Sequence, residues 1–177
     1  MRFKDLVILK PVDESRCVIT SRYWDWRWTH WHRAYDWAPY QMKGELDSDF
    51  YTRRLHEKVH AGIPGKVEQI YHEVDGFGLY VKIRHLEYPI YGYKAHLSEA
   101  LVEEGQIVEA TTPVGIMGHT GRCYSRHNGD GLHTHDEYRE ILSRGRLRPF
   151  NAADYYKSML IGFSNKLKPF QVLPVRG

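Results

Sequence analysis

The stretch Leu79-Tyr80-Val81-Lys82-Ile83-Arg84-His85 nearly alternates apolar and polar side chains along its length. Because successive side chains of a strand point to opposite faces of a sheet, this pattern predicts a strand with one buried face. Turn residues surround it, with glycines in 62–65 and 75–78 before it and Gly92 after it. The middle of the chain is therefore expected to form part of a β-sheet.

Short segments of similar character lie on both sides of this strand. Further strands are expected at Leu6–Leu9, Cys17–Thr20, Gln106–Val108 and Val114–Met117. By pattern, His133–Ile141 fits either a strand or a helix, and the aromatic segment Tyr23–Trp37 fits a structured loop or an irregular strand. Many short strands between glycine-rich turns, with few helices, predict an all-β sandwich or barrel-like fold.

Two short helices complete the expected elements. The first covers Asp47–Glu57, with Ser48 as its N-cap. The second runs from Asn151 to Leu160, with Asn151 as its N-cap and Asp154 in the first turn. Beyond them, the segment 166–177 contains two prolines and is expected to be an extended tail.

Length and composition indicate one globular domain. The chain has 177 residues, of which 42% are hydrophobic and 27% charged, and it contains no internal repeat or low-complexity tract. We expect an N-terminal extension or strand over 1–17, one domain over 18–160 and a tail over 161–177. No apolar run approaches the ~20 residues of a membrane helix, and Leu6–Leu9 is too short for a signal peptide, so we expect neither a membrane span nor a leader.

Charge and residue usage limit the classes of function that this chain can have. The net charge is +3 with the basic residues spread out, so we expect no nucleic-acid partner. Aromatic residues make up 14% of the chain, which suits a β-rich fold or a groove that grips an extended polymer. Cys17 and Cys123 form no CxxC motif, and a disulfide between them is allowed but not implied. The 11 histidines point to metal binding or acid–base chemistry.

The sharpest local motif is Gly131-Leu132-His133-Thr134-His135-Asp136-Glu137. On a strand, His133 and His135 would project from the same face. Their nitrogens could share one metal ion, or one imidazole could bind metal while the other transfers protons. Glu137 continues this face and could accept a hydrogen bond from a ligating histidine.

Two further motifs contain histidine. His32 and Asp36 form an HxxxD pattern, and a neutral imidazole with a carboxylate suits Zn²⁺. His30 is a competing candidate two residues earlier. His96 lies in the string Tyr93-Lys94-Ala95-His96-Leu97-Ser98, which carries weight only in combination with the other motifs.

In this order, HxxxD, YxxHLS and GxHxHxE together resemble the lysostaphin-type (LytM-like) zinc endopeptidases, which cut peptidoglycan cross-bridges. Other segments that resemble the family are Val18–Ser21, His32–Pro39, Val59–Val67, Leu79–His85, Gly105–Gly121 and Phe150-Asn151. The resemblance extends from about residue 18 to about residue 156. It departs from the family pattern at Ala34, Asp136, the apparent insertion Tyr40–Glu57 and the polar loop Cys123–Asp130, which affect groove shape and bond specificity rather than the metal site.

The resemblance implies a role for five residues. His32, Asp36 and His135 would ligate one zinc ion per chain, and His96 and His133 would be the catalytic pair. Three protein ligands leave a fourth zinc position open, as in catalytic sites. The chain has no HExxH motif that would provide a glutamate base, so the two unligated histidines would share the proton transfers. Which histidine takes which role is left open.

The implied fold is an antiparallel β-sheet with a narrow substrate groove. The implied function is that of a bacteriolytic zinc metalloendopeptidase acting on stem or cross-bridge peptides of peptidoglycan. A setting at the cell wall is expected, as a phage lysin or as a virion component among virion proteins. His85 is expected to pack near or support the site.

Three other kinds of protein share some of these sequence features. A LytM-like module that only binds or regulates typically lacks metal ligands, whereas all five positions are present here. A cupin-type metal barrel would use the HxH motif with Glu140, but the cupin glycine spacing is absent and HxxxD has no role in it. The segment Val102–Gly118 has the glycine and valine pattern of biotinyl or lipoyl carriers, without a lysine at the hairpin tip.

Overall fold

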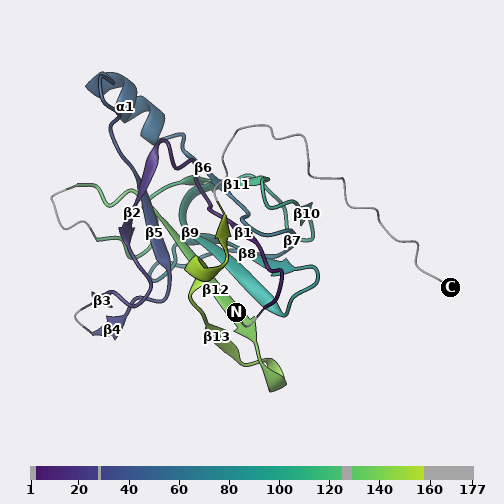
Figure 1. Cartoon of the computed structure of the whole chain (residues 1–177). Helices are drawn as coiled ribbons and strands as arrows, with labels where there is room; N and C mark the ends of the chain where they lie inside the picture. The colour runs from purple at the N-terminus through teal and green to yellow at the C-terminus, as the bar shows by residue number, and fades with distance from the viewer. Residues whose placement is uncertain (1–2, 28, 125–128, 158–177) are drawn as a thin grey trace.

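The structure is a computed structural model that describes residues 3–27, 29–124 and 129–157. One large sheet dominates it (Figure 1). Its main strands are β2 (Cys17–Ser21), β5 (Tyr35–Pro39), β7 (Gly65–His72), β8 (Leu79–His85), β9 (Ile90–Ala100), β10 (Ile107–Val108) and β12 (Thr134–Ile141). They pair in the order β10-β7-β8-β9-β12-β5-β2, and each pair is antiparallel. The prediction of an all-β, mainly antiparallel fold is confirmed.

Shorter strands complete the architecture. They are β1 (Ile8–Leu9), β3 (Trp26–Arg27), β4 (His30–Trp31), β6 (Lys58–His60), β11 (Pro113–Met117), β13 (Leu147–Pro149) and β14 (Tyr156–Lys157). In the main sheet, β11 pairs with β6 and β9, and β13 pairs with β12. Two further sheets have two strands each: β1 and β14 pair in parallel, and β3 and β4 pair antiparallel. The aromatic segment Tyr23–Trp37 thus contains β3, β4 and the start of β5.

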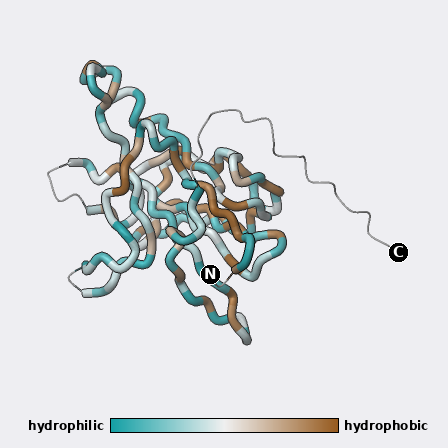
Figure 2. The backbone as a smooth tube through the Cα atoms, viewed as in Figure 1, coloured by the Kyte–Doolittle hydropathy of each residue, from teal (hydrophilic) through white to brown (hydrophobic). Residues whose placement is uncertain are grey.

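The alternation in β8 produces the core. Val81 and Ile83 are fully buried, and Val67 on β7 lies opposite Ile83. The N-terminal segment joins the same core, because Ile8 and Val12 are also fully buried. Figure 2 shows the hydrophobic stretches near the middle of the molecule. Ala152 and Tyr155, near the other end of the described sequence, belong to this core as well.

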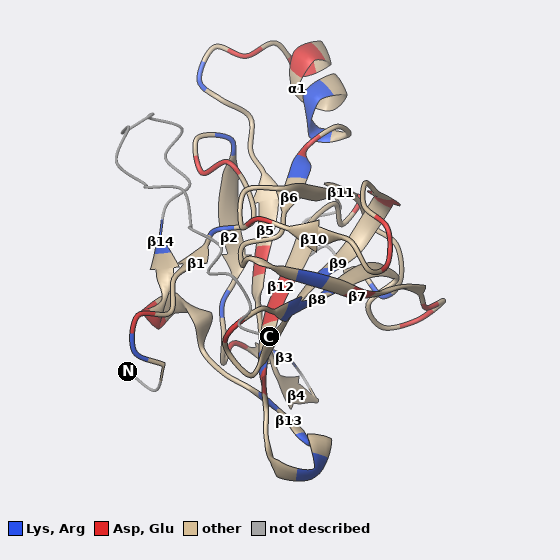
Figure 3. Ribbon diagram, turned by 90° about the vertical axis from the view of Figure 1, so that its right-hand side faces the viewer, with Lys and Arg blue, Asp and Glu red and all other residues tan. Residues whose placement is uncertain are grey.

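The helices are shorter than the sequence predicts. The helix α1 spans Asp47–Arg54 and buries none of its residues, projecting from the sheet (Figures 1 and 3). Its N-cap is Leu46, without a side-chain hydrogen bond, so the prediction of Ser48 is wrong. Asp47 and Asp49 in the first turn favour this start by interacting with the helix dipole. Within the described ranges, no helix is long and apolar enough to cross a membrane.

The predicted helix from Asn151 is also wrong in length. Asn151 does act as the N-cap, because its side chain accepts a hydrogen bond from the Ala153 N–H at 3.0 Å. However, only one 3₁₀ turn follows, Ala152–Asp154, before the chain enters β14 and pairs with β1. A second 3₁₀ turn spans Ser143–Gly145. The rest of the predicted helix, 158–160, and the predicted tail, 166–177, lie outside the described residues.

Candidate metal centre

Three side chains from two distant parts of the chain meet at one end of β12. His32 precedes β5, Asp36 lies on β5, and His135 on β12 is the direct cross-strand partner of Asp36. Figure 3 shows the acidic segments of β5 and β12 side by side. His32 and Asp36 are each 4% exposed, and the His135 side chain is 12% exposed. The strand pairing therefore builds a nearly buried cluster.

The three candidate ligand atoms form a compact triangle. His32 Nε2 lies 3.1 Å from Asp36 Oδ1 and 3.2 Å from His135 Nδ1, and the third side measures 3.1 Å. In a tetrahedral zinc site with bonds of about 2.0–2.1 Å, ligand atoms are separated by roughly 3.3 Å. The triangle thus fits one face of a zinc tetrahedron and leaves the fourth corner to a non-protein ligand.

Hydrogen bonds fix the ring orientation of His32. Its Nδ1 lies 3.0 Å from the Arg22 carbonyl oxygen, which can only accept a hydrogen bond. Nδ1 therefore carries the proton, and the lone pair of Nε2 points to the triangle. Ser21 Oγ is a further neighbour of Nδ1, at 3.3 Å.

His135 is oriented by Glu137, the carboxylate on the same strand face. His135 Nε2–H donates to Glu137 Oε2 at 3.0 Å, and Arg139 Nε donates to Glu137 Oε1 at 2.6 Å. Burial alone would lower the pKa of His135, but its hydrogen bonds to Asp36 and Glu137 raise the pKa to about 9. The carboxylates thus favour a positive charge here, and a metal ion bound at Nδ1 would displace the proton.

Asp36 stays ionised in spite of its burial. Burial would raise the pKa of its carboxyl group, but its close contacts with the His135 and His32 imidazoles hold that pKa well below its ordinary value. Its second oxygen, Oδ2, accepts a hydrogen bond from Arg27 on β3. No sequence motif marked Arg27, because its contact depends on how the β3–β4 hairpin folds over β5.

His96 and His133 form a second pair beside the triangle. Their ring centroids lie 4.6 Å apart, and the ring of His96 lies 5.8 Å from that of His135. His96 Nδ1–H donates to the Thr120 carbonyl at 2.9 Å, and His133 Nδ1–H donates to the Gly131 carbonyl at 2.7 Å. Burial lowers both pKa values, that of His96 to about 3 with a contribution from His133. Both imidazoles are therefore neutral, with Nε2 available to accept a proton.

The backbone at His96 is unusual and was missed by the sequence reasoning. The β8–β9 register shifts between Leu79 and Val81, which places one extra residue on β9 in this region. His96 adopts a φ of 62°, and its N–H donates to the Phe77 carbonyl at 2.9 Å. Bulges redirect side chains, and positive φ in a non-glycine residue is typical of functional sites. Plain strand alternation therefore does not determine where His96 points.

Two glycines make the support of His96 possible. A Cβ on Gly78 would come within 2.3 Å of the Thr120 backbone, and a Cβ on Gly121 within 2.3 Å of the Gly78 nitrogen. The two turns therefore pack backbone against backbone. This contact places the carbonyls of Phe77 and Thr120, which hold the main chain and ring of His96 respectively.

A cavity of about 480 Å³ adjoins both groups of residues. Asp36, Arg54, Asp130 and His133 are among the residues that line it. Its volume is typical of a site that binds a ligand.

Other residues considered from sequence lie elsewhere or in other roles. His30 is exposed on β4, where its Nδ1 lies 3.0 Å from Thr29 Oγ1, so it does not join the cluster. His85 Nδ1 accepts hydrogen bonds from two backbone N–H groups, of Glu87 at 3.0 Å and Tyr88 at 3.1 Å. It therefore supports the turn after β8. Cys17 and Cys123 are both free, so the disulfide that the sequence allowed is not formed.

Comparison with known proteins identifies a family model that fits this chain. The model, described as Peptidase family M23, matches residues 48–142. This range contains His96, His133 and His135, whereas His32 and Asp36 precede it. No curated protein matches the sequence.

Solved structures share the fold at low sequence identity. The catalytic domain of the prophage-encoded M23 protein EnpA from Enterococcus faecalis, in a mutant form, has a TM-score of 0.57 and 22% identity over 78% of this chain. Lysostaphin from Staphylococcus simulans has a TM-score of 0.59 and 17% identity over 80% of this chain. A zinc-containing peptidase from Vibrio cholerae has a TM-score of 0.55 and 23% identity over 79%. The chain spans 92% of the EnpA domain, but 49% of lysostaphin and 37% of the Vibrio protein.

Proposed function

This chain belongs to peptidase family M23, and from that premise we propose that it is a zinc-dependent endopeptidase that hydrolyses stem or cross-bridge peptides of peptidoglycan. The observation that carries the proposal is the triangle of His32, Asp36 and His135, whose ligand atoms lie 3.1–3.2 Å apart. Two imidazoles and one carboxylate form a common ligand set of catalytic zinc.

The fit of the residues to zinc extends beyond the three ligand atoms. His32 and His135 each donate their second N–H, to the Arg22 carbonyl and to Glu137 respectively. Such partners fix the ring and increase the basicity of the ligating nitrogen. When bound, zinc would act as a Lewis acid that polarises the scissile carbonyl and acidifies water.

His96 and His133 would carry out the proton transfers. Because the Nδ1–H of each is bonded to a carbonyl, only Nε2 is available to exchange protons with the substrate. One imidazole would accept the proton of the attacking water, and the other would stabilise the carbonyl oxygen or protonate the leaving amine. Their burial favours the neutral form that a base requires.

The cavity beside the centre supports an extended peptide as substrate. It is lined by Asp36, one corner of the triangle, and by His133, so a peptide bound in it would lie beside both groups of residues. Peptidoglycan peptides fit this description, and the proposed setting is the cell wall. A phage lysin or virion component is the proposed biological form, and the prophage origin of EnpA supports it.

The test is digestion of purified peptidoglycan of several cross-bridge types, with identification of new amino termini by mass spectrometry. We expect one zinc per chain, new amino termini from the zinc-loaded protein and none after chelation. Bound zinc without any cleavage would contradict the proposal and favour a binding or regulatory module.

Variants test the ligands in the same assay. His32→Ala is expected to lose both zinc and activity, because it removes one corner of the triangle. His30→Ala is the matched control, since His30 is exposed only two residues away and is expected to keep both. Full zinc content in His32→Ala would show that the ligand assignment is wrong.

A further inference from the structure

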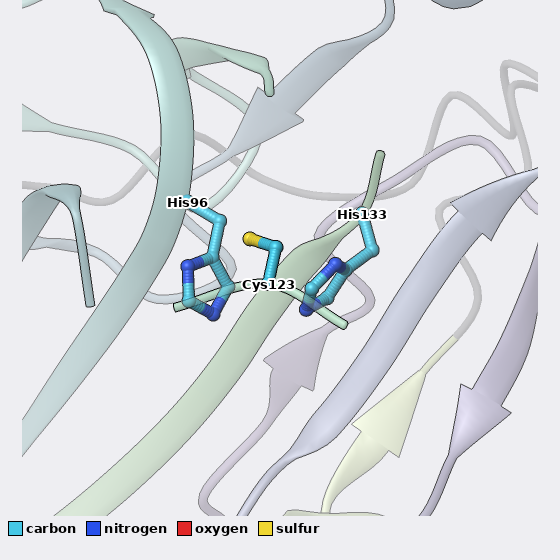
Figure 4. A group of neighbouring side chains, drawn as sticks. All are labelled: His96, Cys123 and His133. Atoms are coloured by element: carbon cyan, nitrogen blue, oxygen red, sulfur yellow. The ribbon is translucent and has the colours of Figure 1, made fainter. Parts of the chain in front are cut away.

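A second group of metal-binding side chains lies next to the first. Cys123 sits between the imidazoles of His96 and His133 (Figure 4). Its Sγ and one nitrogen of each histidine all lie within 4.8 Å of one another. The three residues come from separate segments: His96 from β9, Cys123 from the loop after β11, and His133 from the bridge to Gly118.

The hydrogen bonds of this group leave its ligand atoms available. The Nδ1–H of each histidine donates to a backbone carbonyl, so Nε2 is the nitrogen with a free lone pair. Among the described residues, the Cys123 thiol has one hydrogen-bond partner, the Thr120 carbonyl, to which it donates at 3.4 Å. Two imidazoles and a thiolate are ligands that zinc and softer divalent ions prefer.

We propose that His96, Cys123 and His133 bind a second metal ion, of the zinc or cadmium class, and that this ion inhibits the peptidase. The inhibitory part of the proposal rests on the proposed function. An ion held by both Nε2 atoms occupies the lone pairs that the proton transfers require. The enzyme therefore needs one zinc ion and is inhibited by a second.

The two centres should fill in order. The atoms of the first triangle are already spaced for zinc and include the ionised Asp36. At the second centre the ligand atoms lie within 4.8 Å of one another, none of them belongs to a carboxylate, and the Cys123 thiol must lose a proton to become a ligand. The second ion is thus expected to bind more weakly, only when metal is in excess.

Equilibrium dialysis of the one-zinc protein against Cd²⁺ tests the binding. We expect one further equivalent of metal, retention of the zinc, and the ultraviolet charge-transfer absorption of a cadmium–thiolate bond. Cys123→Ser and Cys123→Ala are expected to bind the second ion at least ~10-fold more weakly, without the absorption. Cys17→Ser is the matched control and should behave like the parent, because Cys17 is buried on β2.

Activity is measured in parallel, with each rate normalised to that of the same protein carrying one zinc ion. Excess zinc or cadmium should inhibit the parent and Cys17→Ser at similar concentrations, and the inhibition curve of Cys123→Ser should shift at least ~10-fold upward. The proposal is overturned if the parent takes up no second ion, if Cys123→Ser binds it equally well, or if the inhibition curves coincide. If peptidoglycan is not cleaved at all, the proposed function fails, while dialysis and absorption still decide whether the second centre exists.

Discussion

In each histidine at the candidate site, one ring nitrogen donates a hydrogen bond, and this leaves the other nitrogen to face a metal ion or exchange a proton. His32, His96 and His133 all donate Nδ1–H to backbone carbonyls, which leaves Nε2 for metal or protons. His135 is the exception, since it faces the triangle through Nδ1 and donates Nε2–H to Glu137. The difference arises because His135 lies within a regular strand, where the carboxylate two residues ahead lies on the same face.

Because Glu137 accepts the Nε2–H of His135, we expect a substitution at Glu137 to change the affinity for zinc. Glu137→Gln keeps a hydrogen-bond acceptor but removes the negative charge that raises the basicity of His135, so zinc affinity is expected to fall about 10–100-fold. Competition with a chelator measures the change. Glu140→Gln is the control, because Glu140 lies on the same strand and pairs with Arg148 instead. Equal losses in both variants would mean that Glu137 has no specific role toward the metal.

His96 and His133 test catalysis separately from metal binding. His133→Ala and His96→Asn should keep zinc bound, while kcat falls by roughly 10²-fold or more, the effect of losing a positioned proton-transfer group. Asparagine is chosen for position 96 because it tolerates the φ of 62° better than alanine. Steady-state kinetics on a defined cross-bridge peptide give the result. A raised KM with unchanged kcat would instead assign these residues to substrate binding.

At the scale of the elements, regular strands were predictable and irregular ones were not. Alternation in Leu79–His85 correctly predicted the buried face of β8, because a half-buried strand imposes a period of two. The HxH spacing likewise anticipated the carboxylate beside His135. The bulge near His96 left no such pattern, since it depends on the contact between Gly78 and Gly121.

Asp136 shows a second limit of the sequence pattern. Resemblance to the family marked it as a departure, but its partner could not be read from the sequence. In the structure Asp136 lies opposite Lys94 across β9 and β12, and the two fully buried side chains form an ion pair. Tyr156 on β14 donates to the other carboxylate oxygen at 2.6 Å. An interaction between residues 42 positions apart is set by strand register alone.

The turn after β8 makes stability depend on pH. Burial, with a contribution from Arg84, lowers the pKa of His85 from 6.5 to about 4. Between these values the unfolded chain binds a proton that the folded protein does not, so acidification favours unfolding. Above pH 6.5 both states are neutral at His85, and this effect vanishes.

His85→Asn should flatten this part of the pH profile. Its amide oxygen can accept from the same N–H groups of Glu87 and Tyr88, but the side chain does not titrate. Urea unfolding between pH 6.5 and pH 4 should therefore show a steeper loss of unfolding free energy in the parent than in the variant. Parallel curves would mean that protonation of His85 is not linked to folding.

At the scale of the whole molecule, the N-terminal segment is packed like part of the domain. The sequence predicts an extension or strand over 1–17, and within this segment the structure has the two-residue strand β1, paired with β14. Ile8 is fully buried, whereas its neighbour Val7 is 46% exposed. This difference in exposure cannot be predicted from composition, because both residues are apolar.

Substitutions at Ile8 and Val7 measure how much the N-terminal segment contributes to the free energy of unfolding. Ile8→Ala is expected to lower the free energy of unfolding by about 2–5 kcal/mol, the usual cost of a core cavity. Val7→Ala should change it by no more than about 0.5 kcal/mol. Denaturant unfolding of both variants gives the comparison. Equal, small effects would place residues 1–17 outside the cooperative unit.

The position of β12 between β9 and β5 has a consequence for biosynthesis. His135 follows His32 by 103 residues and Asp36 by 99. A ribosome therefore releases His32 and Asp36 long before His135, and the β2–β5 pair cannot join β7–β8–β9 until β12 has emerged to lie between them. The candidate metal centre is therefore incomplete in any nascent chain that has not yet been extended through His135.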